Sequence, residues 1–142
     1  MEKDNSFARK KEIRMSKEII ISIVVIILIV ILDITTVRYT SKAVGTLSTT
    51  IEEIKEQILN KDSQDKIQDN INKLRDEWDV YYKKLAYYLE HDELEKVETK
   101  LSRINVYAET KEFEDALSEL DETIFILSHI EDKEKFSFQS MF

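Results

Sequence analysis

The sequence predicts an all-α protein with a single N-terminal transmembrane helix followed by an antiparallel helical bundle or hairpin. Three observations predict this class. The 142 residues include one Gly and no Pro, so almost nothing in the chain interrupts a helix. Apolar residues recur at helical spacing along most of a chain that is 35% charged. One apolar run near the N-terminus contains almost no polar side chain.

The same composition excludes several classes of protein. Phosphate loops, dinucleotide-binding fingerprints and nucleophile elbows need several glycines at fixed spacing, and the chain has only one. The absence of Cys excludes disulfide scaffolds and thiolate zinc sites. A chain of this length is expected to form at most one ordinary domain.

A membrane span is predicted over residues 18–37. Residues 19–32 are aliphatic except for one serine. These fourteen residues are too few to cross a bilayer, but extension through Asp33 to Val37 gives nineteen, close to the length that crosses about 30 Å of hydrocarbon. A cleaved secretory signal is the alternative, and Ser41-Lys42-Ala43 offers only a poor cleavage site for it.

The uneven charge distribution predicts the orientation of this span. Six Lys and Arg side chains precede it, whereas only Arg38 and Lys42 follow closely, so we expect the N-terminus in the cytoplasm and the C-terminal domain outside it. Residues 43–142 carry 13 basic and 24 acidic side chains, a net charge of −11. This charge repels phosphate backbones, so no nucleic acid is expected as a partner.

Apolar stripes after the span predict further helices. A first helix is predicted over about 46–60, with Thr49 and Glu52 in the spacing of a capping box, and a turn follows at 60–63. This helix is expected either to extend the membrane helix or to dock on it. The next stripe has the strongest pattern and contains Ile67, Ile71, Leu74, Trp78 and Leu85. Either Tyr81 or Tyr82 occupies the position between Trp78 and Leu85, and either Tyr88 or Leu89 occupies the position after Leu85. The stripe loses phase at 90–92, where Asp92 and Glu95 suggest a new helix start, and again at 108–110.

These patterns divide the chain into five predicted segments. They are a basic cytoplasmic head (1–17), the transmembrane helix (18–37), a juxtamembrane amphipathic helix and turn (38–62), an acidic helical bundle (63–135) and an aromatic C-terminal tail (136–142). Because neither loss of phase contains Gly or Pro, one longer bent helix is an alternative to two reversals. The pattern also leaves open whether the helices over 63–90, 92–109 and 110–132 fold back within one chain or pair between chains as a coiled coil.

Aromatic residues are the candidates for partner binding. Trp78, Tyr81 and Tyr88 share the core stripe, so Tyr82 and Tyr87 are expected on the surface. In the tail, Phe136 and Phe138 alternate with polar residues, which suits an extended segment better than a helical turn. The predicted partner-binding residues are Tyr82, Tyr87, Phe136, Phe138, Met141 and Phe142. For the tail, the alternative is that it caps its own bundle.

No catalytic arrangement is predicted. The two histidines, His91 and His129, are 38 residues apart, and neither has the spacing that places two metal ligands on one helical face. Pairs of acidic residues lack the apolar surroundings that raise a carboxyl pKa for acid–base work. We therefore expect no enzyme activity, no cofactor, no metal site and no catalytic residue.

The turn after the aromatic helix carries a resemblance to a known family. It reads Tyr88-Leu89-Glu90-His91-Asp92-Glu93-Leu94-Glu95-Lys96-Val97-Glu98, and the chain ends in Glu134-Lys135-Phe136-Ser137-Phe138-Gln139-Ser140-Met141-Phe142. With the short N-terminal anchor, these residues resemble the uncharacterised family called domain of unknown function 4363, small single-span membrane proteins of endospore-forming anaerobes. The resemblance covers most of residues 15–142. It implies a helical protein that acts beside a polytopic membrane protein of the same operon, and it assigns no catalytic residue.

The function expected from these observations is binding or scaffolding. We expect a non-enzymatic, single-pass protein of the cell membrane whose extracytoplasmic helical domain binds another membrane protein. The expected partners are the lipid bilayer and a membrane protein, with a homo-oligomer as a further expectation. A ligand-binding or sensory ectodomain and a coiled-coil protein of division or envelope assembly are the alternatives.

Overall fold

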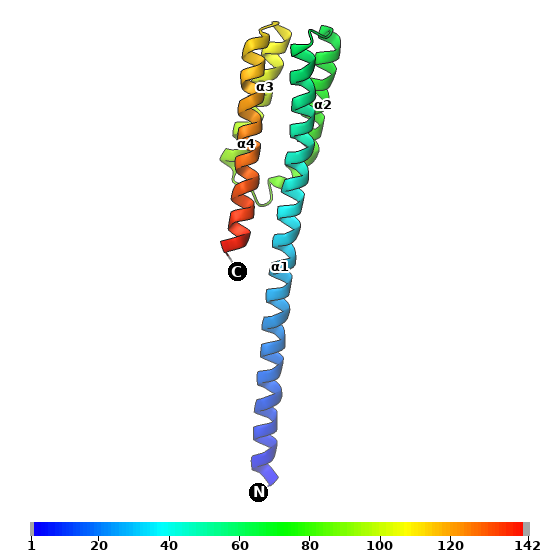
Figure 1. Cartoon of the computed structure of the whole chain (residues 1–142). Helices are drawn as coiled ribbons and strands as arrows, with labels where there is room; N and C mark the ends of the chain where they lie inside the picture. The colour runs from blue at the N-terminus through cyan, green and yellow to red at the C-terminus, as the bar shows by residue number, and fades with distance from the viewer. Residues whose placement is uncertain (1, 141–142) are drawn as a thin grey trace. The chain divides into compact units, whose positions relative to one another are not determined.

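The computed structural model describes residues 2–140, with side chains described from Ser16 onward (Figure 1). The described residues form four α-helices and no strand, which confirms the all-α prediction. The helices are α1 (Glu2–Leu59), α2 (Gln64–Leu85), α3 (His91–Glu109) and α4 (Phe113–Ser140). The chain divides into two compact units, Met1–Thr35 and Thr36–Phe142, and we call the second one the helical unit.

The N-terminal unit is the first part of α1. Its large apolar side chains from Ile19 to Leu32 are exposed, except that of Val30. Their exposed fraction ranges from 45% at Ile29 to 64% at Leu32. Among the described residues, only α1 contains a stretch long and apolar enough to cross a membrane. An N-terminal signal sequence would have the same composition.

α1 continues without a break through residues 36–59, so the helix expected to begin near 46 is an extension of the preceding one. The predicted capping box is wrong, because the Thr49 hydroxyl donates a 2.8 Å hydrogen bond to the Gly45 carbonyl inside the helix. One glycine within a helix costs only about 1 kcal/mol relative to alanine. The packing of this segment outweighs that cost.

Two helices end on a lysine in the left-handed backbone conformation. Lys61 (φ 55°) follows α1 and Lys111 (φ 62°) follows α3. In both turns the next residue closes the helix end: the Asp62 N–H donates to the Gln57 carbonyl, at 2.9 Å, and the Glu112 N–H donates to the Tyr107 carbonyl, at 2.8 Å. This Schellman arrangement usually contains Gly. It explains how the chain interrupts its helices at 60–63 and 110–112 without Gly or Pro.

The helical unit contains residues 36–59 of α1 together with α2, α3 and α4, and consecutive helices run antiparallel (Figure 1). Hydrogen bonds join α1 to α2 between Thr46 and Tyr81 and between Thr50 and Glu77. Contacts between charged or polar side chains also join α2 to α3, α3 to α4 and α4 to α1 (Trp78–Glu98, Lys100–Glu119 and Lys55–Asp121).

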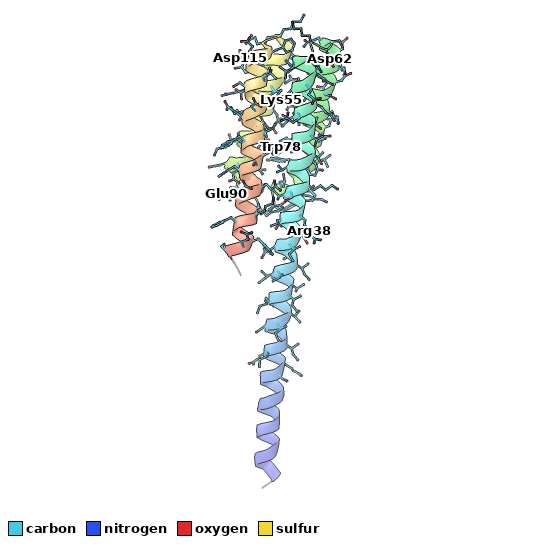
Figure 2. All side chains as sticks on the ribbon, viewed as in Figure 1. Arg38, Lys55, Asp62, Trp78, Glu90 and Asp115 are labelled. Carbon is cyan, nitrogen blue, oxygen red and sulfur yellow. The ribbon has the colours of Figure 1, made fainter. Side chains whose placement is uncertain are left out.

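The interior of the helical unit is filled by the predicted stripes. Trp78 is its largest fully buried side chain and lies inside the helices in Figure 2. Other core residues are Leu47, Ile51, Ile54, Ile67, Ile71, Leu74, Leu94, Val97, Leu101, Ile104 and Leu120. The helical interruptions predicted near 90–92 and 108–110 are confirmed by the ends of α2, α3 and α4. The alternative of one longer bent helix is therefore excluded.

The prediction of an extended tail is wrong for residues 136–140, because α4 continues to Ser140. Phe138 lies eleven residues after Leu127, which is three helical turns, and so falls on the face of α4 that carries the buried Leu127. Phe136 falls on the opposite, exposed face. Two phenylalanines separated by one residue therefore also fit a helix, in which the two rings lie on opposite faces. Met141 and Phe142 lie outside the described residues.

Candidate interaction surfaces

Tyrosine side chains from α1, α2 and the α2–α3 turn connect these elements through hydrogen bonds and ring contacts. The Tyr88 hydroxyl lies 2.9 Å from the Thr40 hydroxyl and 3.4 Å from the Thr36 carbonyl. Desolvation raises the pKa of Tyr88 above its ordinary value, although the hydrogen bond with Thr40 opposes this. The Tyr39 ring meets the Tyr81 ring edge to face at 5.6 Å. These side chains connect α1 to α2 and are not available to a partner.

The two tyrosines predicted for the surface have different environments. Tyr82 is half-buried, and its ring meets the Trp78 indole edge to face at 5.8 Å. Tyr87 lies in the turn after α2 and is 88% exposed. Phe136 is 72% exposed and Phe138 is half-buried, both in the last turns of α4. Among the described members of the predicted set, Tyr87 and Phe136 are thus the most exposed aromatic rings.

Tyr87 and Phe136 lie on different elements but at the same end of the helical unit. Tyr88, beside Tyr87, bonds to Thr36, and Glu131 near the end of α4 accepts a hydrogen bond from Ser41. We call this end, which contains Thr36, the proximal end. The opposite, distal end contains the turns at 60–63 and 110–112, and Figure 2 shows Asp62 and Asp115 there.

The sequence analysis missed a third exposed ring, Phe125, which is 74% exposed on the outer face of α4. Phe125, His129 and Phe136 follow at steps of four and seven residues, so they lie along one face of the helix. The signal was present in the sequence. Leu120, Ile124 and Leu127 have the spacing of a buried helix face, and Phe125, which immediately follows Ile124, is out of phase with them.

Charged side chains form pairs between helices. Glu119 of α4 is mostly buried and accepts from Lys100, at 2.7 Å, and from Arg103, at 3.4 Å. Lys133 of α4 reaches Glu90 and Glu93, both at 2.9 Å. Hydrogen bonds from Lys133 to Glu93 and Glu90 raise its pKa to about 12. These ion pairs join α4 to α3 and to the N-terminal cap of α3.

Among the open grooves on the outer surface, two are lined mainly by charged or amide side chains. The groove of 660 Å³ beside α3 is lined by Lys96, Lys100 and Arg103 together with Asp92 and Glu95. Because Lys100 and Arg103 are already paired with Glu119, this groove has no excess of positive charge for an anion. The second groove, of 600 Å³, is lined mainly by amide side chains of α2 and α3 that bond to one another, such as Gln68 and Asn105 at 2.8 Å.

The histidines are exposed and do not come together with other ligands. In the part of the chain that the structure describes, no group of three His, Cys, Asp or Glu side chains could hold a metal ion. His91 begins α3, and His129 lies on the outer face of α4.

Comparison with known proteins places the chain in a family. No curated protein and no solved structure matches it. The model of one family, described as "Domain of unknown function (DUF4363)", matches residues 34–141. This match begins within two residues of the start of the helical unit and includes all of α2, α3 and α4. The chain therefore belongs to the DUF4363 family.

Proposed function

We propose that this protein is a non-enzymatic, single-span membrane protein whose helical unit lies outside the cytoplasm and binds or scaffolds another membrane protein. The observation that carries the proposal is the exposed apolar surface of α1 from Ile19 to Leu32. Burial of one Val, Leu or Ile side chain is worth about 1.5–3 kcal/mol. A helix with such side chains on every face is stable in lipid and strongly unfavourable in water.

The orientation is supported by the basic residues. Six Lys and Arg side chains precede the apolar run, and two follow it within a few residues. The side with more basic residues stays in the cytoplasm. Residues 36–142 would then be extracytoplasmic.

The proposed form of the helical unit is a four-helix bundle formed within one chain. The stripes of α1 and α2 are covered by side chains of the same chain, and Ile51, Ile71 and Trp78 are among the buried residues. A coiled coil between chains would need these same faces. The filled interior also leaves little room for a small ligand between the helices, which disfavours a sensory role.

Partner binding is proposed for the outer face of α4 around Phe125. An exposed phenylalanine is costly in water and is a frequent anchor at protein interfaces. His129 lies one turn away on the same face and can contribute a polar contact. No observation of comparable weight supports an enzymatic role.

Single cysteines test the membrane topology, because the chain has no Cys of its own. The full chain is expressed with Lys10→Cys or Lys61→Cys, and intact cells are treated with a membrane-impermeant maleimide. We expect labelling of Lys61→Cys at the distal end and no labelling of Lys10→Cys until the cells are opened. Labelling of Lys10→Cys in intact cells would contradict the orientation.

Photo-crosslinking tests the partner surface. A photoreactive amino acid at Phe125 is expected to crosslink the full chain to another membrane protein in its native membrane. The same amino acid at Val80, an exposed apolar residue of α2, is the control and should give no such product. A crosslink to a second copy of the chain would favour a homo-oligomer, and no crosslink at Phe125 would contradict partner binding by α4.

A further inference from the structure

We infer that the proximal end of the helical unit is a lipid-contacting surface: Tyr87 and Phe136 insert into the headgroup region of the membrane and hold the unit against it. The inference rests on the proposed span, but it assigns a second contact with the bilayer, outside α1. It also assigns these two rings to contact with lipid, whereas the sequence predicted that they contact a partner protein.

The height of Phe136 follows from the pairing of α4 with α1. Lys55 of α1 and Asp121 of α4 form an ion pair at 2.6 Å, so the two antiparallel helices pass each other near these residues. Phe136 lies fifteen residues further along α4, about 22 Å at 1.5 Å per residue. The same distance along α1 from Lys55 leads to Thr40, three residues after the predicted span. Phe136 therefore lies within about one helical turn of the end of the predicted span.

The height of Tyr87 follows from its neighbour in the chain. The Tyr88 hydroxyl contacts the Thr36 carbonyl and the Thr40 hydroxyl. The turn between α2 and α3 is thus held at the level of residues 36–40. Tyr87 and Phe136 reach similar heights although they lie 49 positions apart in the sequence.

Both rings extend away from the core and are largely exposed. Aromatic rings with an apolar body gain most at the boundary between headgroups and hydrocarbon, where tyrosine is enriched. Phe125 provides a contrast on the same face of α4. It is exposed to a similar degree but lies eleven residues, about 16 Å, further from the span.

The proximal end offers cations to lipid headgroups. Arg38, Lys42 and Lys83 form no ion pair among the described residues, and all three are exposed. Of the acidic residues at this end, Glu90, Glu93 and Glu131 are paired with Lys133 or Lys135, Asp92 and Asp132 form no ion pair among the described residues, and Glu134 lies near Tyr88. Unpaired cations next to exposed aromatic rings are typical of surfaces that bind anionic membranes.

The distal end has the opposite character. Its exposed acidic residues without an ion pair among the described residues are Glu56, Asp65, Asp69, Glu109, Glu112, Glu114 and Asp115, and they outnumber the exposed, unpaired cations Lys61 and Lys111. Anionic headgroups repel such a surface. The charge distribution therefore favours contact of the membrane with the proximal end only.

Spin labels on single cysteines of the full chain test the inference. Phe136→Cys, Tyr87→Cys, Phe125→Cys and Ile27→Cys are labelled with a nitroxide, and the protein is reconstituted in vesicles of phosphatidylethanolamine and phosphatidylglycerol. Collision of the label with oxygen, which concentrates in lipid, is compared with collision with a water-soluble nickel chelate. All four side chains are exposed, so the substitutions should leave the fold intact, and Trp78 fluorescence checks this.

We expect a high ratio of oxygen to nickel collisions at Ile27, an intermediate ratio at Phe136 and Tyr87, and a low ratio at Phe125. Phe125 is the matched control, because it has the same label, the same helix face and a similar exposure but a different height. A low ratio at Phe136 and Tyr87 with a high ratio at Ile27 would overturn the inference and leave the span intact. A low ratio at Ile27 would instead overturn the proposed span. Exclusion of both reagents at Phe136 would indicate protein contact and would also overturn the inference.

Discussion

Trp78 Nε1 donates a 2.6 Å hydrogen bond to Glu98 Oε2, and this bond joins the middle of α2 to the middle of α3. The indole ring is 1% exposed, whereas the Glu98 carboxylate lies at the edge of the interface, where it also contacts Arg75 at 3.5 Å. The largest buried side chain of the helical unit thus satisfies its one polar atom without placing a charge in the core.

Residues 36–142 should fold without the span, because this fragment contains the whole core of the helical unit together with the buried Thr40 and with Tyr39, which packs against the core. Its strong negative charge should also keep the fragment soluble. We expect a strongly helical circular-dichroism spectrum and a cooperative unfolding transition in urea. An unordered spectrum at neutral pH would contradict the presence of an independent helical unit.

Trp78→Ala should destabilise this fragment by about 3–5 kcal/mol, since it leaves a large cavity in the core. Glu98→Ala should cost about 1–3 kcal/mol, because the buried indole N–H loses its acceptor. Urea unfolding followed by circular dichroism measures both. Glu95→Ala on the exposed face of α3 is the control and should change the free energy of unfolding by less than about 0.5 kcal/mol. Equal effects at Glu95 and Glu98 would argue against the hydrogen bond.

Lys100 and Glu119 should behave as a partly buried ion pair. Their side chains are 16% and 11% exposed, and their charged atoms lie 2.7 Å apart. Lys100→Met should lower the free energy of unfolding by about 2 kcal/mol. This is less than the loss expected when a fully buried charge loses its partner, because Arg103 still contacts Glu119. Combining Lys100→Met with Glu119→Leu should recover most of this loss, since no unpaired carboxylate is then buried.

The control for this cycle is the exposed pair of Lys66 and Asp62, which are four residues apart at the start of α2. Lys66→Met should change the free energy of unfolding by less than about 1 kcal/mol. A double variant at Lys100 and Glu119 that is less stable than either single variant would contradict the ion-pair interpretation.

Gly45→Ala should stabilise the helical unit by about 0.5–1 kcal/mol, because glycine is a poor residue for the interior of a helix. Gly45 lies within α1, and no atom lies within 4 Å of the position that its Cβ would take. The melting temperature of the fragment should therefore rise. A lower melting temperature would contradict this prediction and would show that α1 needs the conformational freedom of Gly45.

Glu131 should make the helical unit less stable in acid. A hydrogen bond from Lys135, at 2.6 Å, lowers the pKa of this carboxyl below 4.5, and the hydrogen bond from Ser41 acts in the same direction against desolvation. Because the folded state binds the proton less readily than the unfolded state, this contribution is present above pH 4.5 and is lost as the pH falls through the lowered pKa.

The measurement is the melting temperature of the fragment between neutral pH and about pH 3, a range that spans the ordinary carboxylate pKa. Glu131→Gln should show a smaller decrease in acid than the parent, whereas Glu95→Gln should follow the parent. If Glu131→Gln loses as much stability in acid as the parent, the contact of Glu131 with Lys135 does not contribute in solution.

Several features of the fold could be predicted from the sequence because they depend on periodicity within one helix. The stripe with Ile67, Ile71, Leu74 and Trp78 predicted a buried face, and all four side chains are buried. The scarcity of Gly and Pro predicted helices throughout the chain, and the apolar run identified the one candidate span. A residue's phase along a helix determines its face, and the sequence contains that phase directly.

The candidate surfaces were harder to predict, because burial of an aromatic ring depends on the neighbouring helix. Tyr82 was expected on the surface but packs against Trp78, whereas Phe125 is exposed beside a core residue of the same helix. Tyr88 is held by Thr36 and Thr40, which lie about fifty residues earlier in the chain. No local pattern contains such contacts.

The sequence by itself determined the helical class, the apolar run and the inward faces of the helices after it. The sequence also predicted the interruptions near 60–63, 90–92 and 108–110, and only the tertiary structure decided that the segment from 46 continues the preceding helix and which backbone conformation ends α1 and α3. α1 passes through Gly45 and Thr49 without a break, whereas Lys61 and Lys111 end helices in a backbone conformation that lysine rarely adopts. The physical reason is that local preferences amount to about 1 kcal/mol per residue, and the burial of several side chains against neighbouring helices outweighs them.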